Sequence, residues 1–250
     1  MRLKDQVVIV TGGANGIGRE YCTHLAQEGA RLVIADIDVA GAEALAAEFN
    51  AGEAGRALAI RADVTSEADT EAMAEAAVEA FGRIDVLVNN AGMYPHVDFP
   101  DISYDHWRKV MAVNLDSVFL CSRAVLPVMK AQEKGKIINI ATNLVWIGLA
   151  SMVHYVASKA GVVGFTRALA REVGSFGVTV NALAPGAVIP SPELLDDAAL
   201  ARVESIVSHQ SVQWCQRAVD VVGPLLFLAS PESDFMSGQV LTVDGGLTNH

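Results

Sequence analysis

Cysteine is scarce in this sequence, which has three among its 250 residues. Cys22, Cys121 and Cys215 lie roughly a hundred residues apart, without the paired spacing of a disulfide framework or a zinc site. The histidines are scattered as well, so we expect no catalytic metal. Unpaired thiols suit a reducing compartment, and residues 1–6 lack the apolar core of a signal peptide. We therefore expect a cytoplasmic protein.

Positively charged residues are also few. The sequence has 18 Lys and Arg residues and 29 Asp and Glu residues, which gives a net charge of -11. A surplus of this sign repels the phosphates of nucleic acids and anionic membrane surfaces. The uncharged run 137–158 is long enough to span a bilayer, but Asn139, Thr142, Asn143 and other polar residues interrupt it. We expect neither nucleic acid nor a membrane as a partner.

Polar linkers, repeats and low-complexity tracts are absent, and a content of 52% apolar and 19% charged residues is typical of a globular protein. Apolar, β-branched runs of strand length alternate with amphipathic or alanine-rich segments. We expect strands at 7–10, 31–35, 57–60, 84–88, 136–140, 178–183 and 240–243, and helices at 16–29, 39–50, 66–82, 104–130, 153–174 and 218–229. The alternation predicts one α/β domain over residues 1–250, with a doubly wound parallel sheet of about seven strands and helices on both faces.

One segment interrupts this alternation. Between 185 and 211, Pro190 and Pro192 precede a helical stretch of mixed polarity. An insertion after the carboxyl end of a strand lies beside the ligand crevice of such a sheet. We expect residues 187–214 to form a substrate lid.

A glycine-rich turn directly follows the first expected strand and opens the first helix. Such a turn lets the backbone approach a pyrophosphate, and the helix N-terminus favours the anion, although the pattern can also be only a tight turn. The candidate cofactor-binding residues of this turn are Gly12, Asn15, Gly16, Ile17 and Gly18.

An acidic residue, Asp36, ends the second expected strand 18 residues after Gly18. Near this spacing, a carboxylate accepts hydrogen bonds from an adenosine ribose and repels a 2′-phosphate. Neither the glycine-rich turn nor Ile37 offers a cation to offset that repulsion. The pattern favours NAD(H) over NADP(H), while Asp36 taken alone could be a helix cap or a turn residue before Asp38.

Two further strands end in residues suited to a ligand site. Asp63 and Val64 follow the third strand, and Asn90, Ala91 and Gly92 follow the fourth. Open α/β sheets bind ligands at these carboxyl ends, where Asn and Gly can also be simple turn formers. We assign these five residues to the cofactor site.

Tyr155 and Lys159 lie four residues apart and therefore on one face of a helix. A fixed ammonium stabilises a phenolate, so Lys159 is expected to lower the Tyr155 pKa from its ordinary value of about 10. The pair would then serve acid/base chemistry. The same spacing also occurs in ordinary surface pairs.

These motifs, together with Asn114, Pro185-Gly186 and the closing Asp244-Gly245-Gly246, resemble the short-chain dehydrogenase/reductase family over essentially the whole chain. The resemblance implies a Rossmann-type fold and hydride transfer to or from a bound nicotinamide cofactor, which Asp36 leads us to expect is NAD. It makes Tyr155 the general acid/base. It makes Lys159 the group that lowers the Tyr155 pKa and binds the ribose, and Asn114 the anchor of a proton-relaying water.

The chain departs from the family pattern at two places. Thr142 stands where the family normally has a serine that hydrogen-bonds the substrate oxygen, and Asn143 could share that role. Pro185, Gly186 and Val188 are expected to contact the nicotinamide. Ser191 follows where many relatives offer a threonine to the carboxamide.

The loops expected to line the substrate site are mainly apolar, and residues 143–154 contain no Lys or Arg. This favours a hydrophobic secondary alcohol or ketone over a CoA thioester or sugar phosphate. The candidate pocket residues, each of which could instead pack in the core, are Tyr94, Asn143, Trp146, Met152 and Trp214. A finer similarity points to the NAD-dependent dehydrogenases of 1-phenylethanol-type aryl alcohols.

Two other functions stay open. The first is an NAD-linked 3-hydroxyacyl or ketoacyl reductase, and the second is a catalytically silent nucleotide-binding regulator of the same fold.

The resemblance also implies a homotetramer with helices 104–130 and 153–174 at a subunit interface. Gly161 and Gly164, unfavourable inside a helix, fit the close approach of another helix.

Overall fold

The protein is built on one sheet of seven parallel strands. The computed structural model describes residues 1–53, 55–189 and 196–249, with only the backbone of residues 198, 199 and 202. The strands are β1 (Val7–Thr11), β2 (Arg31–Asp36), β3 (Ala57–Arg61), β4 (Val86–Asn89), β5 (Gly135–Ile140), β6 (Val178–Pro185) and β7 (Val240–Val243). Their order is β3-β2-β1-β4-β5-β6-β7, which confirms the predicted fold.

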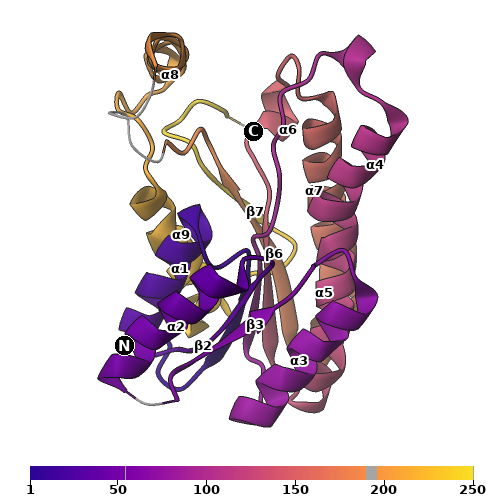
Figure 1. Ribbon diagram of the computed structural model, residues 1–250, viewed down its shortest axis with the longest axis vertical. Coiled ribbons are helices and arrows are strands. Elements are labelled where there is room, and N and C mark those ends of the chain that lie inside the picture. The colour runs from indigo at the N-terminus through magenta and orange to yellow at the C-terminus, as the bar shows by residue number, and fades with distance from the viewer. Residues whose placement is uncertain (54, 190–195, 250) are drawn as a thin grey trace.

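Helices cover both faces of the sheet (Figure 1). On one face lie α1 (Gly16–Gln27), α2 (Val39–Gly52) and α9 (Val222–Ala229), and on the other α3 (Glu67–Phe81), α5 (Ser117–Ala131) and α7 (Val153–Val173). All residues of β1, β4 and β5 are buried, as expected for strands sandwiched between two helix layers. The continuous apolar runs of the sequence are the consequence of this double burial.

The expected helix 104–130 is a composite. It begins as α4 (Tyr104–Met111), widens into a π-turn, η2 (Ala112–Asp116), and continues as α5. The π-turn carries the fully buried Asn114, and such widened turns often occur at functional sites. By length and composition alone, Tyr104–Ala131 could cross a membrane, a test that the core helix of a soluble protein also passes.

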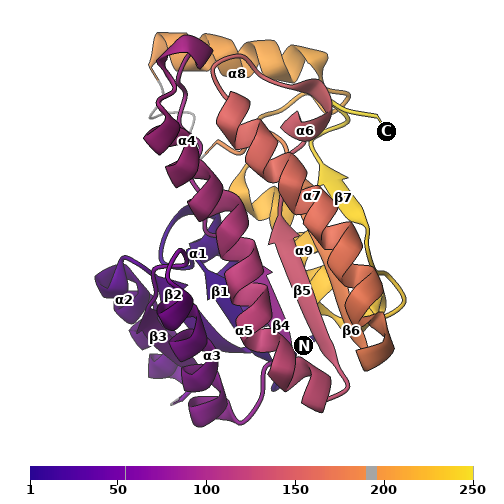
Figure 2. The same ribbon diagram turned by 90° about the vertical axis from the view of Figure 1, so that its right-hand side faces the viewer.

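Shorter elements surround the carboxyl edge of the sheet. α6 (Leu144–Ile147) follows β5, and α8 (Asp197–His209) is the helical stretch expected after the prolines. In both views α8 lies beyond the carboxyl ends of the strands, and Figure 2 shows it running across the end of the molecule that holds α4 and α6. Single 3-10 turns occupy Phe99–Asp101, Gly174–Phe176, Ala218–Val221 and Pro231–Ser233. Pro190 and Pro192 of the expected lid lie outside the described residues.

Candidate active site

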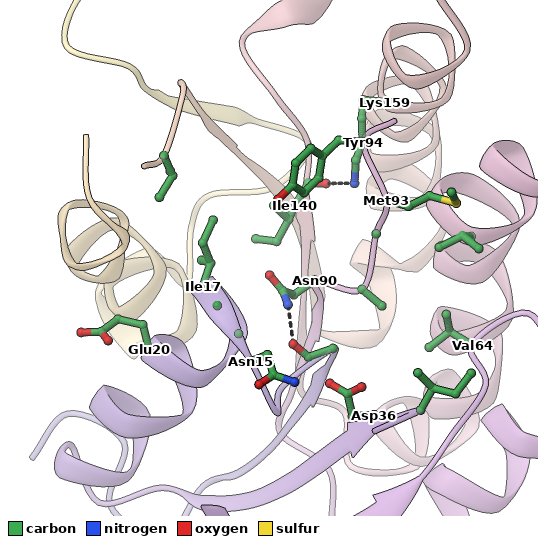
Figure 3. A pocket seen from close by; sticks show the side chains of 18 of the residues that line it. Asn15, Ile17, Glu20, Asp36, Val64, Asn90, Met93, Tyr94, Ile140 and Lys159 are labelled. Carbon is green, nitrogen blue, oxygen red and sulfur yellow. Dashed lines mark hydrogen bonds between the residues drawn. The ribbon is translucent and has the colours of Figure 1, made fainter. Parts of the chain in front are cut away.

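A cavity of about 760 Å³ opens at the carboxyl ends of the strands β1 to β5 (Figure 3). It runs from the glycine-rich turn to the Tyr155–Lys159 face of α7, so one space joins the two motifs that the sequence singled out. The predicted residues that line it are Gly12, Asn15, Gly16, Ile17, Gly18, Asp36, Ile37, Asp63, Val64, Asn90, Ala91, Gly92, Tyr94, Tyr155, Lys159 and Val188.

The glycine-rich turn needs glycine for its shape and its contacts. Gly12 and Gly16 have φ angles of +63° and +53°, a region that strains other residues. A Cβ on Gly18 would collide with the carbonyl oxygen of Gly12, whereas nothing lies within 4 Å of the Cβ position of Gly16. The Nδ2 of Asn90 donates to the carbonyl oxygens of Thr11 and Gly12, both at 3.0 Å, and ties β4 to the turn. The result is a fixed backbone cradle, open to the cavity, that fits a dinucleotide phosphate.

Asp36 stands half-buried at the opposite wall of this cradle. Its carboxylate accepts the amide N–H groups of Ala14 at 2.9 Å and Asp38 at 3.0 Å. The cap of α2 is Asp38, which accepts from Gly41, so Asp36 is not the helix cap that the sequence left open. Asn15 donates to Asp38 at 3.0 Å, and this bond is the main cause of the lowered pKa of Asp38. Of these two carboxylates, Asp36 lines the cavity beside the glycine-rich turn.

Lys159 is buried at the other end of the cavity. Its side chain is 4% exposed, and Nζ donates to the carbonyl oxygen of Ile140 at 2.7 Å (Figure 3). Burial penalises the charged ammonium and lowers the pKa of Lys159 to about 8. An amine held in this way can gain or lose a proton within a physiological range.

The Tyr155 pKa differs from the sequence-based prediction. Burial raises it, a side-chain hydrogen bond from Thr142 lowers it by less, and the nearby Tyr94 phenol raises it further. Lys159 is not among its causes, because the amine is directed to Ile140 and is itself destabilised by burial. Without a bound cofactor, Lys159 therefore does not lower the Tyr155 pKa, and its lowering by Lys159 together with a bound nicotinamide cation stays a prediction.

Asn114 lies behind the cavity and hydrogen-bonds the loop that follows β4. Its Oδ1 accepts the N–H of Met93 and its Nδ2 donates to the carbonyl oxygen of Met93, both at 2.8 Å, while Nδ2 also donates to Ser158 at 3.2 Å. A Cβ on Gly92 would lie 3.3 Å from Asn114 Oδ1 and 3.6 Å from Lys159 Nζ. Asn114 thus connects the loop after β4 to α7 at a point beside Lys159. Its role in a water relay stays a prediction.

The two polar residues after β5 point to different places. Thr142 hydrogen-bonds Tyr155, so its hydroxyl lies where the family pattern expects the serine. Asn143 is buried, and its Nδ2 donates to Asp244 at 3.1 Å. Asp244, which also accepts hydrogen bonds from Gly246 and Thr248, binds this amide, and Asn143 does not line the cavity. Its contact with substrate stays a prediction.

Several other predicted residues do not line the cavity. Gly186 packs against Asp244 and Gln216 behind its wall, and Pro185 accepts the N–H of Asn143. Trp146 packs in a small cluster with Ala141 and Val163, Met152 is buried, and Trp214 is 63% exposed. Ser191 lies outside the described residues. The wall also contains residues that sequence reasoning did not assign to the site, namely Glu20, Ala62, Val113, Ile140, Ala141 and Ala218, together with Met93, which belongs to a loop expected to line the substrate site.

Some of these additional wall residues could have been recognised from the sequence. Glu20 follows Gly16 by four residues and so shares its helix face, and Ile140 and Ala141 end β5 at the carboxyl edge where the other site residues lie. Val113 precedes Asn114 within the π-turn, which no pattern in the sequence indicates. Among the residues that the structure describes, no group of three His, Cys, Asp or Glu side chains is placed to hold a metal ion.

Comparisons with known proteins agree with this geometry. A family model described as short chain dehydrogenase matches residues 6–193. The chain is 40% identical over 246 residues to the (2S)-[(R)-hydroxy(phenyl)methyl]succinyl-CoA dehydrogenase subunit BbsD of Thauera aromatica, covering 98% of both chains. It is 36% identical over 248 residues to the 3-oxoacyl-[acyl-carrier-protein] reductase FabG of Thermotoga maritima, covering 99% of both. It is also 36% identical over 252 residues to the L-rhamnose 1-dehydrogenase (NAD(P)(+)) of Azotobacter vinelandii, covering 99% of this chain and 98% of the relative.

Proposed function

Because this chain belongs to the short-chain dehydrogenase/reductase family, whose members are oxidoreductases that use NAD or NADP, we propose that it transfers hydride between NAD(H) and a hydrophobic, aryl or cyclic, secondary alcohol or its ketone. The observation that carries the proposal is a single cavity. One end has a glycine cradle beside Asp36, and the other has Tyr155, hydrogen-bonded to Thr142, beside the buried Lys159.

Each residue at the catalytic end has a separate task. Tyr155 takes the proton of the substrate hydroxyl during oxidation and returns it during reduction. Thr142 hydrogen-bonds the same oxygen and orients it toward the phenol. Lys159, whose pKa of about 8 lets it change charge near neutrality, holds positive charge near the site as the proton moves. When bound, NAD⁺ supplies the hydride acceptor and NADH the donor.

The choice of NAD over NADP follows from charge. Asp36 lines the end of the cavity where the adenosine would lie, and the glycine-rich turn beside it offers no cation. A 2′-phosphate placed there would meet like charge.

We predict that Asp36→Ser raises kcat/KM with NADP⁺, relative to NAD⁺, by at least about tenfold, because about 1.4 kcal/mol of repulsion is removed. Steady-state kinetics with both cofactors measure the ratio. Asp38→Ser is the matched control, since it removes a charge of the same sign on the other side of Ile37, and it should change the ratio much less. An unchanged ratio in Asp36→Ser would contradict the assignment.

The substrate proposal rests on the apolar wall of the cavity near Tyr155. Met93, Tyr94, Val113, Ile140 and Val188 line it. The name of the Thauera relative contains a hydroxy(phenyl)methyl group, which is an aryl secondary alcohol, and this supports the aryl preference.

An acyl thioester reductase is the second candidate, because two of the relatives are named for a substituted succinyl-CoA and for a 3-oxoacyl-[acyl-carrier-protein]. Coenzyme A and acyl carrier protein present phosphate, and residues 143–154 carry no Lys or Arg to bind it. A panel of substrates distinguishes the candidate functions. NADH formation would be followed with 1-phenylethanol, cyclohexanol, a 3-hydroxyacyl-CoA and L-rhamnose. Turnover of the thioester alone would favour the reductase, and NAD binding without any turnover would favour a silent regulator.

Thr142 gives a further prediction. If only its hydroxyl matters, Thr142→Ser should retain kcat within about threefold, whereas Thr142→Val should lower kcat about a hundredfold by removing a hydrogen bond to the reacting oxygen. Both variants keep a side chain of similar size, so the cofactor KM serves as the control and should stay constant. Equal activity of the serine and valine variants would remove Thr142 from the mechanism.

We also propose a homotetramer that uses the outer faces of α5 and α7. Phe119 on α5 is 47% exposed, and nothing lies within 4 Å of the Cβ position of Gly164 on α7. Gly161 is explained within the chain, because its Cβ would meet the side chain of Leu115. Sedimentation at micromolar concentration tests the assembly, and Gly164→Glu should dissociate it. A monomeric mass for the wild type would end the proposal.

A further inference from the structure

His154 is a buried titratable side chain that the mechanism above does not use. It precedes Tyr155 in the first turn of α7 and has no exposed surface. Consecutive helical residues point about 100 degrees apart, and Tyr155 lines the cavity whereas His154 does not. The imidazole is therefore not a proton donor to the substrate, and its burial needs another explanation.

The imidazole binds the backbone of the residue that carries the reactive phenol. Its Nδ1 accepts the amide N–H of Tyr155 at 3.0 Å. The first amides of a helix have no partner within the helix, and Met152, at the N-cap of α7, makes no side-chain cap. His154 thus satisfies an amide that would otherwise be unpaired. Because Nδ1 is the acceptor, the proton of the neutral ring is assigned to Nε2, which is buried and has no hydrogen-bond partner among the described residues.

A second histidine holds the other side of the ring. The rings of His154 and His106 are 5.0 Å apart between centroids and cross at 86°. His106 lies on α4, which runs directly into the π-turn that carries Asn114. Asn114 in turn donates to Ser158 one turn further along α7. The first turns of α7 are therefore fastened to the α4–η2 segment at two places, His154 and Ser158.

We propose that His154 is a positioning residue for Tyr155: its neutral imidazole holds the Tyr155 amide against α4, and protonation of the ring releases that hold and lowers activity in acid. The proposal rests on the dehydrogenase function proposed above. A protonated ring has N–H donors at both nitrogens and no acceptor, so the bond to the Tyr155 amide is lost. It also places a charge inside the protein, facing a second imidazole.

The surroundings keep the ring neutral at ordinary pH. Burial is the main cause that lowers the pKa of His154, and the charge of His106 lowers it further, while a hydrogen bond with the Met152 carbonyl acts in the opposite direction. Among the described titratable side chains, His106 on α4 contacts the ring, and Tyr155 is the next residue on the same helix. Among the described residues, His106 is the one side chain whose charge shifts the His154 pKa.

This arrangement also links stability to pH with a defined sign. The pKa of His154 is lower in the folded than in the unfolded state, so between the two values the unfolded chain binds more protons. The free energy of unfolding therefore falls as the pH drops below about 6.5. This effect needs no cofactor and no substrate.

Three variants test the proposal. His154→Asn keeps an acceptor oxygen near the place of Nδ1 but cannot titrate. His154→Phe keeps an aromatic ring without the acceptor. His106→Phe keeps the ring contact and removes the charge. We expect the wild type to lose kcat on the acid side with a kinetic pKa below about 6.5. His154→Asn should remove this loss and keep the activity near neutrality, and His106→Phe should move it to higher pH.

His154→Phe should lower kcat about tenfold at every pH with an unchanged KM for NAD⁺, because the Tyr155 amide loses its partner. A side chain with a merely structural role would lower stability without removing the acid-side loss of kcat. If His154→Asn titrates like the wild type, or if His106→Phe leaves the profile in place, the proposal is wrong.

Measurements of unfolding distinguish a failure of this proposal from a failure of the proposed function. Urea unfolding would be measured without ligands between about pH 7.5 and pH 5, a range that spans histidine titration. His154→Asn should lose less unfolding free energy over this range than the wild type does. If no alcohol is oxidised but this difference is found, the proposed function fails while the buried neutral imidazole stands. If the two proteins lose the same amount, the proposal about His154 fails whatever the activity.

Discussion

Tyr155→Phe is expected to lower kcat by about a thousandfold and to leave NAD⁺ binding nearly unchanged. The change removes a single oxygen, the one that exchanges a proton with the substrate, and proton transfer of this kind contributes about 10²- to 10⁴-fold to a rate. The remaining ring keeps its packing on α7 and its place in the cavity wall. Turnover would be measured by NADH formation with the best alcohol of the panel, and cofactor affinity by quenching of intrinsic fluorescence.

Tyr94→Phe is the matched control for this variant. Tyr94 lines the same cavity, and its phenol lies near enough to raise the Tyr155 pKa. Removing that hydroxyl should therefore ease ionisation of Tyr155 and change kcat far less. If Tyr155→Phe kept more than about a tenth of the activity, which is outside the range for loss of an acid/base group, the proton would have to be moved by another residue.

Lys159→Met is expected to abolish most turnover and yet to stabilise the protein without ligands near neutral pH. Burial lowers the pKa of Lys159 from 10.5 to about 8, so the ammonium is held in the folded state against its preference for water. This lowering of the Lys159 pKa corresponds to about 3 kcal/mol. We expect the free energy of unfolding of Lys159→Met to increase by at most this amount. The lost hydrogen bond to Ile140 reduces the gain.

The pH dependence of this gain has a definite sign. Below about pH 8 the lysine is charged in both states, and the folded state carries the full penalty. Between about pH 8 and 10.5 the folded protein has released the proton while the unfolded chain still binds it, so wild-type stability rises with pH. The advantage of Lys159→Met should therefore be largest near neutrality and shrink through this window. Urea unfolding at several pH values measures it.

Lys136→Met provides the comparison, because Lys136 is also buried but forms an ion pair with Asp234 at 2.7 Å. Lys136→Met removes this ion pair and the hydrogen bond from Nζ to Ser233, so the variant should be less stable than the wild type at neutral pH. A stabilising effect in both variants would mean that removing any buried lysine helps. A destabilising effect in both would mean that Lys159 is not strained by its burial.

The fold was accessible from the sequence because its signals are local. Each buried parallel strand is a continuous apolar run, and the glycine-rich turn needs a residue without Cβ at Gly18, where a Cβ would strike Gly12. The positions of Tyr155 and Lys159 on one helix face follow from helical spacing alone. These features depend on neighbours within a few residues, which is the range that a sequence pattern reports.

The site was less accessible where contacts join distant segments. Asn143 is adjacent to Thr142, but it turns to Asp244, 101 residues further along the chain. Trp146 and Met152 are apolar residues beside the site, and composition cannot distinguish a cavity wall from a core position for them. The Tyr155 pKa shows the same limit. Helical spacing places an amine nearby, but only the packing reveals that burial outweighs it.

The strand order also determines how the chain reaches its native state. Val8 of β1 pairs with Val86 of β4, so the centre of the sheet closes only after 78 residues of chain have been brought together. Within the described parts of the chain, every strand pairing is parallel and spans a crossover, so none is made through a hairpin. Contacts of such high sequence separation slow folding, because loop-closure entropy is lost before the contacts form. A nascent chain that ends before β4 leaves one side of β1 unpaired, and an unpaired strand edge is prone to aggregation.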